Sequence, residues 1–85
     1  LFHLDARNLC VTSWTPLVGK RGVRVRVLET AARATRAHFS AVRPIHFAAQ
    51  TDFRGQAVLE CRIEEGKAVF EIAANEWVQF DIEWE

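Results

Sequence analysis

The feature that most constrains the fold is a strict alternation of apolar and basic residues in the first half of the chain. Val23, Val25 and Val27 alternate with Arg24 and Arg26. Successive side chains of a β-strand point to opposite faces. The alternation therefore predicts a strand with one buried face and one solvated face. We expect this strand to continue through residues 28 and 29.

Weaker signals of the same kind recur along the rest of the chain. Strands are expected over residues 8–14, 45–49, 56–63, 68–73 and 78–84. Their expected buried faces carry Ala57, Leu59, Cys61 and Ile63, then Ala68, Phe70 and Ile72, then Val78, Phe80, Ile82 and Trp84. Residues 64–67 are expected to form a hairpin loop, with Gly66 at the position that needs a positive φ. Six or seven short strands in this arrangement predict an all-β fold, an antiparallel β-sandwich.

Residues 30–43 support two interpretations. Ala and Arg are strong helix formers, and Thr30 and Pro44 would begin and end a helix suitably. The alternative is a turn near residues 31–33 followed by a strand with Ala37, Phe39 and Ala41 on one side. The residues themselves leave both open.

Length and composition indicate a single domain over residues 1–85. Six Phe and three Trp supply apolar surface for a core. No stretch approaches the roughly 18 apolar residues of a membrane-spanning helix, so no membrane partner is expected. The start is too short and polar for a targeting segment, which leaves the compartment open and slightly favours the cytoplasm. The chain starts at Leu1 and lacks Met, so we expect it to be a piece of a longer protein.

Charge is divided unevenly between the halves of a chain that is neutral overall. Residues 1–43 contain eight basic and two acidic residues, whereas residues 44–85 contain three basic and nine acidic ones. A nucleic-acid-binding protein would rarely cancel its own basic field in this way. We therefore expect strands from the two halves to lie side by side and neutralise each other, and we expect no nucleic-acid partner.

Metal-binding and cysteine patterns are absent from the sequence. His3, His38 and His46 do not have the spacing of zinc ligands, so no metal or cofactor is expected in this chain. Cys10 and Cys61 are too far apart for a zinc motif or a disulfide-rich scaffold. Cys61 is expected to be a small core residue, and structural or free thiols are favoured over the alternative, a disulfide between the two cysteines.

Catalytic patterns are absent as well, and no catalytic residue is assigned. Asp81, Glu83 and Glu85 share one strand face, where calcium binding or paired acids of a glycosidase are the alternatives to a solvated surface. The solvated surface, neutralised by Arg24 and Arg26, is favoured because carboxylates on a flat face do not surround a ligand. Ser13 and Ser40 lack the glycine-flanked turn that exposes a nucleophile.

The tryptophans are the only candidates for ligand contact. Trp14 and Trp77 lie near the ends of expected strands, where each could stack on a sugar ring or cover a neighbouring domain. Trp84 belongs to an expected buried face and is assigned to the core.

Several segments resemble the C-terminal β domain of glycoside hydrolase family 38, the α-mannosidases. Arg26-Val27-Leu28-Glu29 is similar to the end of a strand in that family, where Gly-Arg usually follows; Ala32-Arg33 stands there in this chain. Residues 8–16 resemble the preceding strand, except that Trp14 replaces a common lysine. Residues 52–56 and 80–84 are similar to the final strands, so the likeness covers about residues 8–84.

The resemblance implies a β-sandwich, with residues 30–43 as strand, and a non-catalytic role. Members of the family are retaining glycosidases that remove α-linked mannose with an aspartate nucleophile and a zinc ion. Those residues lie in an N-terminal catalytic domain, and none maps onto this chain. The chain is therefore expected to be an accessory domain that packs against the remainder of the enzyme. The alternatives are an independent carbohydrate- or protein-binding module and a small enzyme with its own pocket.

Overall fold

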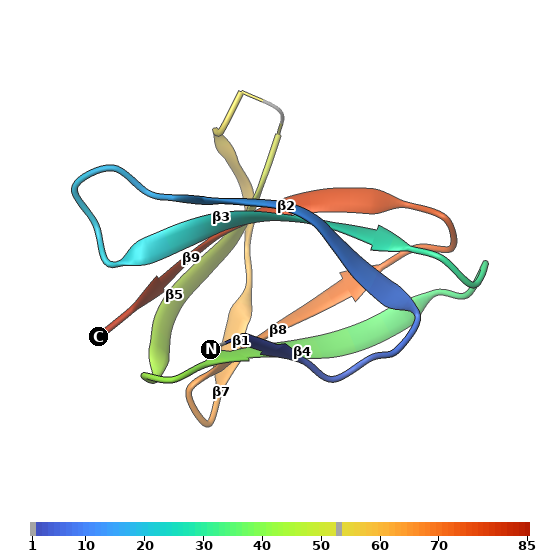
Figure 1. Cartoon of the computed structure of the whole chain (residues 1–85), viewed down its shortest axis with the longest axis horizontal. Coiled ribbons are helices and arrows are strands. Elements are labelled where there is room, and N and C mark those ends of the chain that lie inside the picture. Colours follow the sequence, from blue (N-terminus) through green and yellow to red (C-terminus); the bar gives the residue numbers. More distant parts are fainter. Residues whose placement is uncertain (1, 53) are drawn as a thin grey trace.

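The chain folds into two antiparallel β-sheets that pack on each other, seen in the computed structural model (Figure 1). The structure describes residues 2–52 and 54–85, and these contain strands and turns but no helix. The four-stranded sheet has the order β1 (Phe2–Leu4), β4 (Thr35–Ala41), β8 (Lys67–Ile72), β7 (Arg62–Glu64). The five-stranded sheet has the order β2 (Leu9–Pro16), β3 (Gly22–Glu29), β9 (Trp77–Trp84), β5 (Ile45–Thr51), β6 (Ala57–Glu60).

The predicted β-sandwich is confirmed, although the described residues form nine strands rather than six or seven. The short strand β1 was not expected, because three residues are too few to reveal a pattern. The expected strand over residues 56–63 is two strands, since the chain leaves the five-stranded sheet after Glu60 and enters the four-stranded sheet at Arg62. No helix of the described residues has the length and hydrophobicity needed to cross a bilayer.

The core lies between the sheets and follows the predicted alternation. Val23, Val25 and Val27 of β3 are at most 2% exposed. Phe80 of β9 contacts Phe70 of β8, with ring centroids 4.3 Å apart, and so joins the two sheets. The wider buried cluster also includes Ala37, Phe39, Ile45, Ala48, Cys61, Ala68, Ile72, Val78 and Ile82.

Residues 30–43 contain a strand, β4, and not a helix. Ala37 and Phe39 are buried and pair with Phe70 and Ala68 of β8. Ala41 is half-buried at the end of the strand. Cross-strand pairing and burial thus outweigh the helix preference of Ala and Arg in this segment.

The face expected to be buried over residues 56–63 is buried only at its far end. Cys61 is 9% exposed, and its backbone N–H donates to the Ala48 carbonyl at 2.8 Å. Leu59, by contrast, is 63% exposed and Ala57 is exposed as well. The reason is that β6 is an edge strand, so fewer neighbours cover its inner side.

The expected hairpin at residues 64–67 is confirmed. Glu64 pairs with Lys67, and the two residues between them, Glu65 and Gly66, have φ values of 52° and 76°. Two consecutive positive φ angles are typical of the tight turn whose twist matches that of the flanking strands.

Candidate functional site

Three connections meet at the carboxylate of Glu29, the last residue of β3. Glu29 is 1% exposed. Its Oε2 atom accepts hydrogen bonds from Asn8 Nδ2 at 2.6 Å and from the Ala31 backbone N–H at 2.8 Å. Its Oε1 atom accepts from the backbone N–H groups of Arg33 at 2.9 Å and Asn75 at 3.0 Å. We call Glu29 and these four donors the Glu29 cluster. It joins the β1–β2, β3–β4 and β8–β9 connections.

The surroundings of Glu29 keep its carboxylate charged. Burial raises the pKa of the Glu29 carboxyl, but the hydrogen bonds from Asn75, Asn8, Ala31 and Arg33 together lower that pKa to about 2. The group is therefore ionised at neutral pH, with its oxygens directed at donors within the fold. Such a carboxylate stabilises loops and does not exchange protons with a substrate near neutral pH.

The turn after β3 is shaped by the Glu29 cluster and contains a residue in an unusual conformation. Ala32 has a φ of 58°, in the left-handed region. Glycine adopts this region freely, whereas a residue with a Cβ atom does so at a cost of roughly 1–2 kcal/mol. The backbone at Ala32 thus adopts a conformation that glycine favours.

The acidic residues of β9 lie beside basic residues of neighbouring segments, as the charge pattern predicts. Arg24 Nε and Nη2 donate to the two carboxylate oxygens of Asp81 at 2.7 and 3.0 Å. Glu83 Oε2 lies 3.6 Å from Lys20 Nζ. Arg26 Nε donates instead to the side chain of Gln79 at 2.9 Å. These contacts tie the carboxylates to the outer surface of the sheet and do not aim them at a common point.

Trp14 and Trp77 are both exposed, but they lie on opposite faces of the five-stranded sheet. Trp14 is 57% exposed and pairs with the buried Val25, so it belongs to the inner face. Trp77 is 42% exposed and pairs with Leu28 on the outer face, and the Arg26 guanidinium carbon lies 5.5 Å from the centre of its ring. The two rings therefore cannot bind one ligand together, and each would contact a ligand separately.

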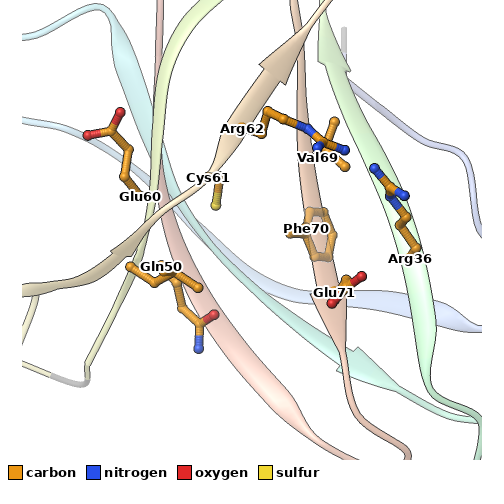
Figure 2. A pocket seen from close by; sticks show the side chains of 9 residues that line it. Arg36, Gln50, Glu60, Cys61, Arg62, Val69, Phe70 and Glu71 are labelled. Atoms are coloured by element: carbon orange, nitrogen blue, oxygen red, sulfur yellow. The ribbon is translucent and has the colours of Figure 1, made fainter.

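An open cavity of about 440 Å³ lies where β6 and β7 approach β8 (Figure 2). It is lined by Arg36, Gln50, Leu59, Glu60, Cys61, Arg62, Val69, Phe70 and Glu71. Arg62 Nε lies 2.7 Å from a carboxylate oxygen of Glu64, and Arg36 Nη2 lies 3.9 Å from the same atom. Phe70 is 6% exposed and offers no face for stacking. The lining thus contains both acidic and basic side chains, and its one aromatic ring, that of Phe70, is buried.

The two cysteines differ in their surroundings. Both are free thiols, Cys10 exposed and Cys61 buried. Burial raises the pKa of the Cys61 thiol, so the reactive thiolate is rare there. Within residues 2–52 and 54–85, no group of three or more His, Cys, Asp or Glu side chains is placed to hold a metal ion.

A row of polar, ionisable side chains on the outer face of the four-stranded sheet was not expected from the sequence. His38 Nδ1 lies 2.8 Å from Asp5 Oδ2, and His38 Nε2 lies 3.9 Å from Glu64 Oε1. Hydrogen bonds from the His38 backbone and ring lower the pKa of Asp5, against the opposing effect of its burial. These partners are far apart in sequence, and no local pattern connects them.

The role of Glu29 was also missed, although the sequence contained a signal for it. Glu29 continues the alternation of Val23, Val25 and Val27, so its side chain belongs to the buried face. A carboxylate at a buried position requires hydrogen-bond donors. The donors Asn8 and Asn75 could not be identified beforehand, because their proximity depends on the packing of the sheets.

Comparisons with known proteins identify no relative. No protein-family model matches the chain, and no significant match is found among curated proteins or solved structures.

Proposed function

We propose that this chain is a non-catalytic accessory domain of a glycoside hydrolase, an α-mannosidase similar to family 38, whose catalytic domain lies outside the 85 residues. The observation that carries the proposal is the Glu29 cluster. The segment that resembles the family, Arg26-Val27-Leu28-Glu29 with Arg33 after it, contributes the Glu29 carboxylate and the Arg33 backbone N–H to this cluster. The resemblance therefore includes Glu29, the residue on which this loop junction depends.

The role of the Glu29 cluster is to hold loops together rather than to take part in a reaction. The Glu29 carboxylate accepts hydrogen bonds from three separate connections, and the low pKa keeps it ionised. The backbone at Ala32 has the positive φ that glycine, the usual residue of the family at this point, adopts most readily. A motif of this kind specifies a loop junction, which suits a domain that supports a catalytic domain elsewhere.

The exposed apolar side chains agree with this role. Val11, Trp14, Val42 and Leu59 are between 43% and 76% exposed. An accessory domain would bury part of this surface against its neighbours and so hold the shape of the catalytic domain. The zinc ion that the resemblance implies would belong to the catalytic domain, and no residue of this chain is assigned to it.

The test compares the parent polypeptide with the isolated chain. We expect the parent to hydrolyse an aryl α-mannoside and the 85-residue chain to leave it intact. Removal of this domain from the parent is expected to lower its melting temperature. A parent polypeptide without glycosidase activity, or hydrolysis by the isolated chain, would contradict the proposal.

The second candidate, an independent carbohydrate-binding module, is favoured by the exposure of Trp14 and Trp77. It predicts saturable binding of α-mannosides to the isolated chain, followed by tryptophan fluorescence. Because the two rings lie on opposite faces, Trp14→Ala and Trp77→Ala identify the binding ring separately. Binding abolished by one of these variants and kept by the other would favour the module over the accessory domain.

A further inference from the structure

We propose that β2 is the edge through which this chain docks, and that the occupant is an uncharged, apolar, extended strand of a neighbouring domain in the parent polypeptide. The existence of that neighbour rests on the proposed function. The choice of edge and the chemistry of the occupant rest on the structure alone.

The first observation is that the inner side of β2 is only partly covered. Val11 pairs with Val27, and Trp14 pairs with Val25. The β3 partners are 0% and 2% exposed, whereas Val11 is 43% and Trp14 is 57% exposed. The apolar side chains on this face are thus fully buried on β3 but about half exposed on the adjacent strand β2. From the four-stranded sheet, only the contact of Phe2 in the three-residue strand β1 with Trp14 is recorded against β2 among the described residues.

The second observation is that β2 has a long edge without charge. It is an outermost strand, bonded to β3 on one side, and none of its eight residues is Asp, Glu, Lys, Arg or His. The other edge strands differ: β1 has three residues, β6 contains Glu60, and β7 contains Arg62 and Glu64. Short length and charge protect edges from pairing with other strands. Only the bulge at Thr12 and the terminal Pro16 interrupt the edge of β2.

The third observation is that the apolar side chains near β2 are already held in place. The Trp14 ring packs edge-on against Phe2, with centroids 5.3 Å apart. Phe2 in turn contacts Trp84 and Phe39. Beside them, a mainly apolar cavity of about 230 Å³ is lined by Phe2, Ala41, Val42, Arg43 and Trp84. A partner would therefore meet a surface whose rings need little further ordering.

These observations determine the chemistry of the occupant. The free backbone groups of β2 accept an extended strand, because such a strand supplies matching donors and acceptors. The half-exposed Val11 and Trp14 require apolar side chains on the inner side of that strand. The absence of charge on β2 gives a charged segment no partner and imposes a desolvation cost on it.

Hydrogen exchange of backbone amides, compared between the isolated chain and the parent polypeptide, tests the proposal. We expect the amides of β2 that do not bond to β3 to exchange rapidly in the isolated chain and to be protected in the parent. Trp14→Lys and Val11→Lys in the parent should abolish this protection. Val58→Lys is the matched control, because Val58 is 67% exposed on the other edge of the same sheet. Melting of each variant in the isolated chain checks that it still folds.

Equal exchange of β2 in both forms, or protection that appears only at β6, would overturn the proposal. Protection of β2 in the isolated chain that grows with protein concentration would overturn it too, because the occupant would then be a second copy. The outcome does not depend on glycosidase activity. A parent without such activity whose β2 is protected contradicts the proposed function but supports the docking edge.

Discussion

At the scale of single residues, the loop junction of this domain depends on one buried charge. Glu29 is 1% exposed, yet both of its carboxylate oxygens are occupied by donors from distant loops. An ionised group in this setting is stable only while every donor is in place, since an unpaired buried charge carries a large desolvation cost. The same residue should therefore govern both loop order and the response of the domain to acid.

Acid should weaken the domain through Glu29. Its folded pKa of about 2 lies below its ordinary value of 4.5. The stabilisation is thus fully present above pH 4.5 and is lost as the pH falls towards 2. In Glu29→Gln the side-chain NH2 group would face the hydrogen-bond donors that surround Glu29. The variant should therefore melt at a lower temperature than the wild type at pH 7, and should lose less stability than the wild type as the pH falls from 4.5 towards 2. Urea unfolding at several pH values measures this, with the exposed Glu85→Gln as control.

A substitution at Ala32 should stabilise the domain, whereas Glu29→Gln should destabilise it. Glycine relieves the left-handed strain but also gains freedom when unfolded, so Ala32→Gly should raise the free energy of unfolding by up to about 1 kcal/mol. Ala34→Gly is the matched control, because Ala34 is exposed and is not among the described residues with positive φ. We expect it to lower stability by about 0.5–1 kcal/mol. Denaturant midpoints compare the two, and a loss at both positions would refute the assigned backbone role.

At the scale of elements, the burial of a valine depends on the position of its strand in the sheet. Val27 of β3 is 0% exposed, whereas Val58 of the edge strand β6 is 67% exposed. Val27→Ala removes two buried carbons and leaves a cavity, so it should cost about 2 kcal/mol. Val58→Ala should change the unfolding free energy by less than about 0.5 kcal/mol. Chemical denaturation of both variants checks the contrast, which would fail if the two losses were equal.

The sequence was sufficient where local pattern and packing agree. The alternation in β3 and the hairpin at Glu65–Gly66 were both predictable, because each signal lies within a few residues. Residues 30–43 were ambiguous, since helix preference and strand alternation compete there and pairing with β8 decides between them. The exposure of Leu59 could not be foreseen, because it depends on where the opposite sheet ends. The Glu29 cluster was predictable only in part, as a buried carboxylate without known donors.

At the scale of the whole molecule, the uneven charge of the two halves becomes a contact between adjacent strands. The basic β3 belongs to the first half of the chain and lies beside the acidic β9 of the second. Arg24 and Asp81 occupy directly opposite positions. The charge pattern thus favours the correct neighbours within the sheet and leaves no large field of one sign.

A double-mutant cycle measures this contribution. Arg24→Met and Asp81→Asn, singly and combined, should give a coupling of about 0.5–1 kcal/mol that decreases as salt is added. The bidentate geometry supports this value, whereas the single 3.6 Å contact of Lys20 and Glu83 should couple more weakly. Equal coupling for both pairs would show that geometry is unimportant here.

The passage of the chain from one sheet to the other at Cys61 gives the molecule a built-in reporter of local opening. Cys10 is exposed and should be alkylated first. Cys61 is 9% exposed at the wall of the open cavity and has a raised thiol pKa, so it should react more slowly and gain further access when the corner between β6 and β7 separates from β5. Mass spectrometry after addition of a thiol reagent would follow the two mass increases. The delay between them would report how often that corner opens. Two equally fast increases would mean that the corner is open most of the time.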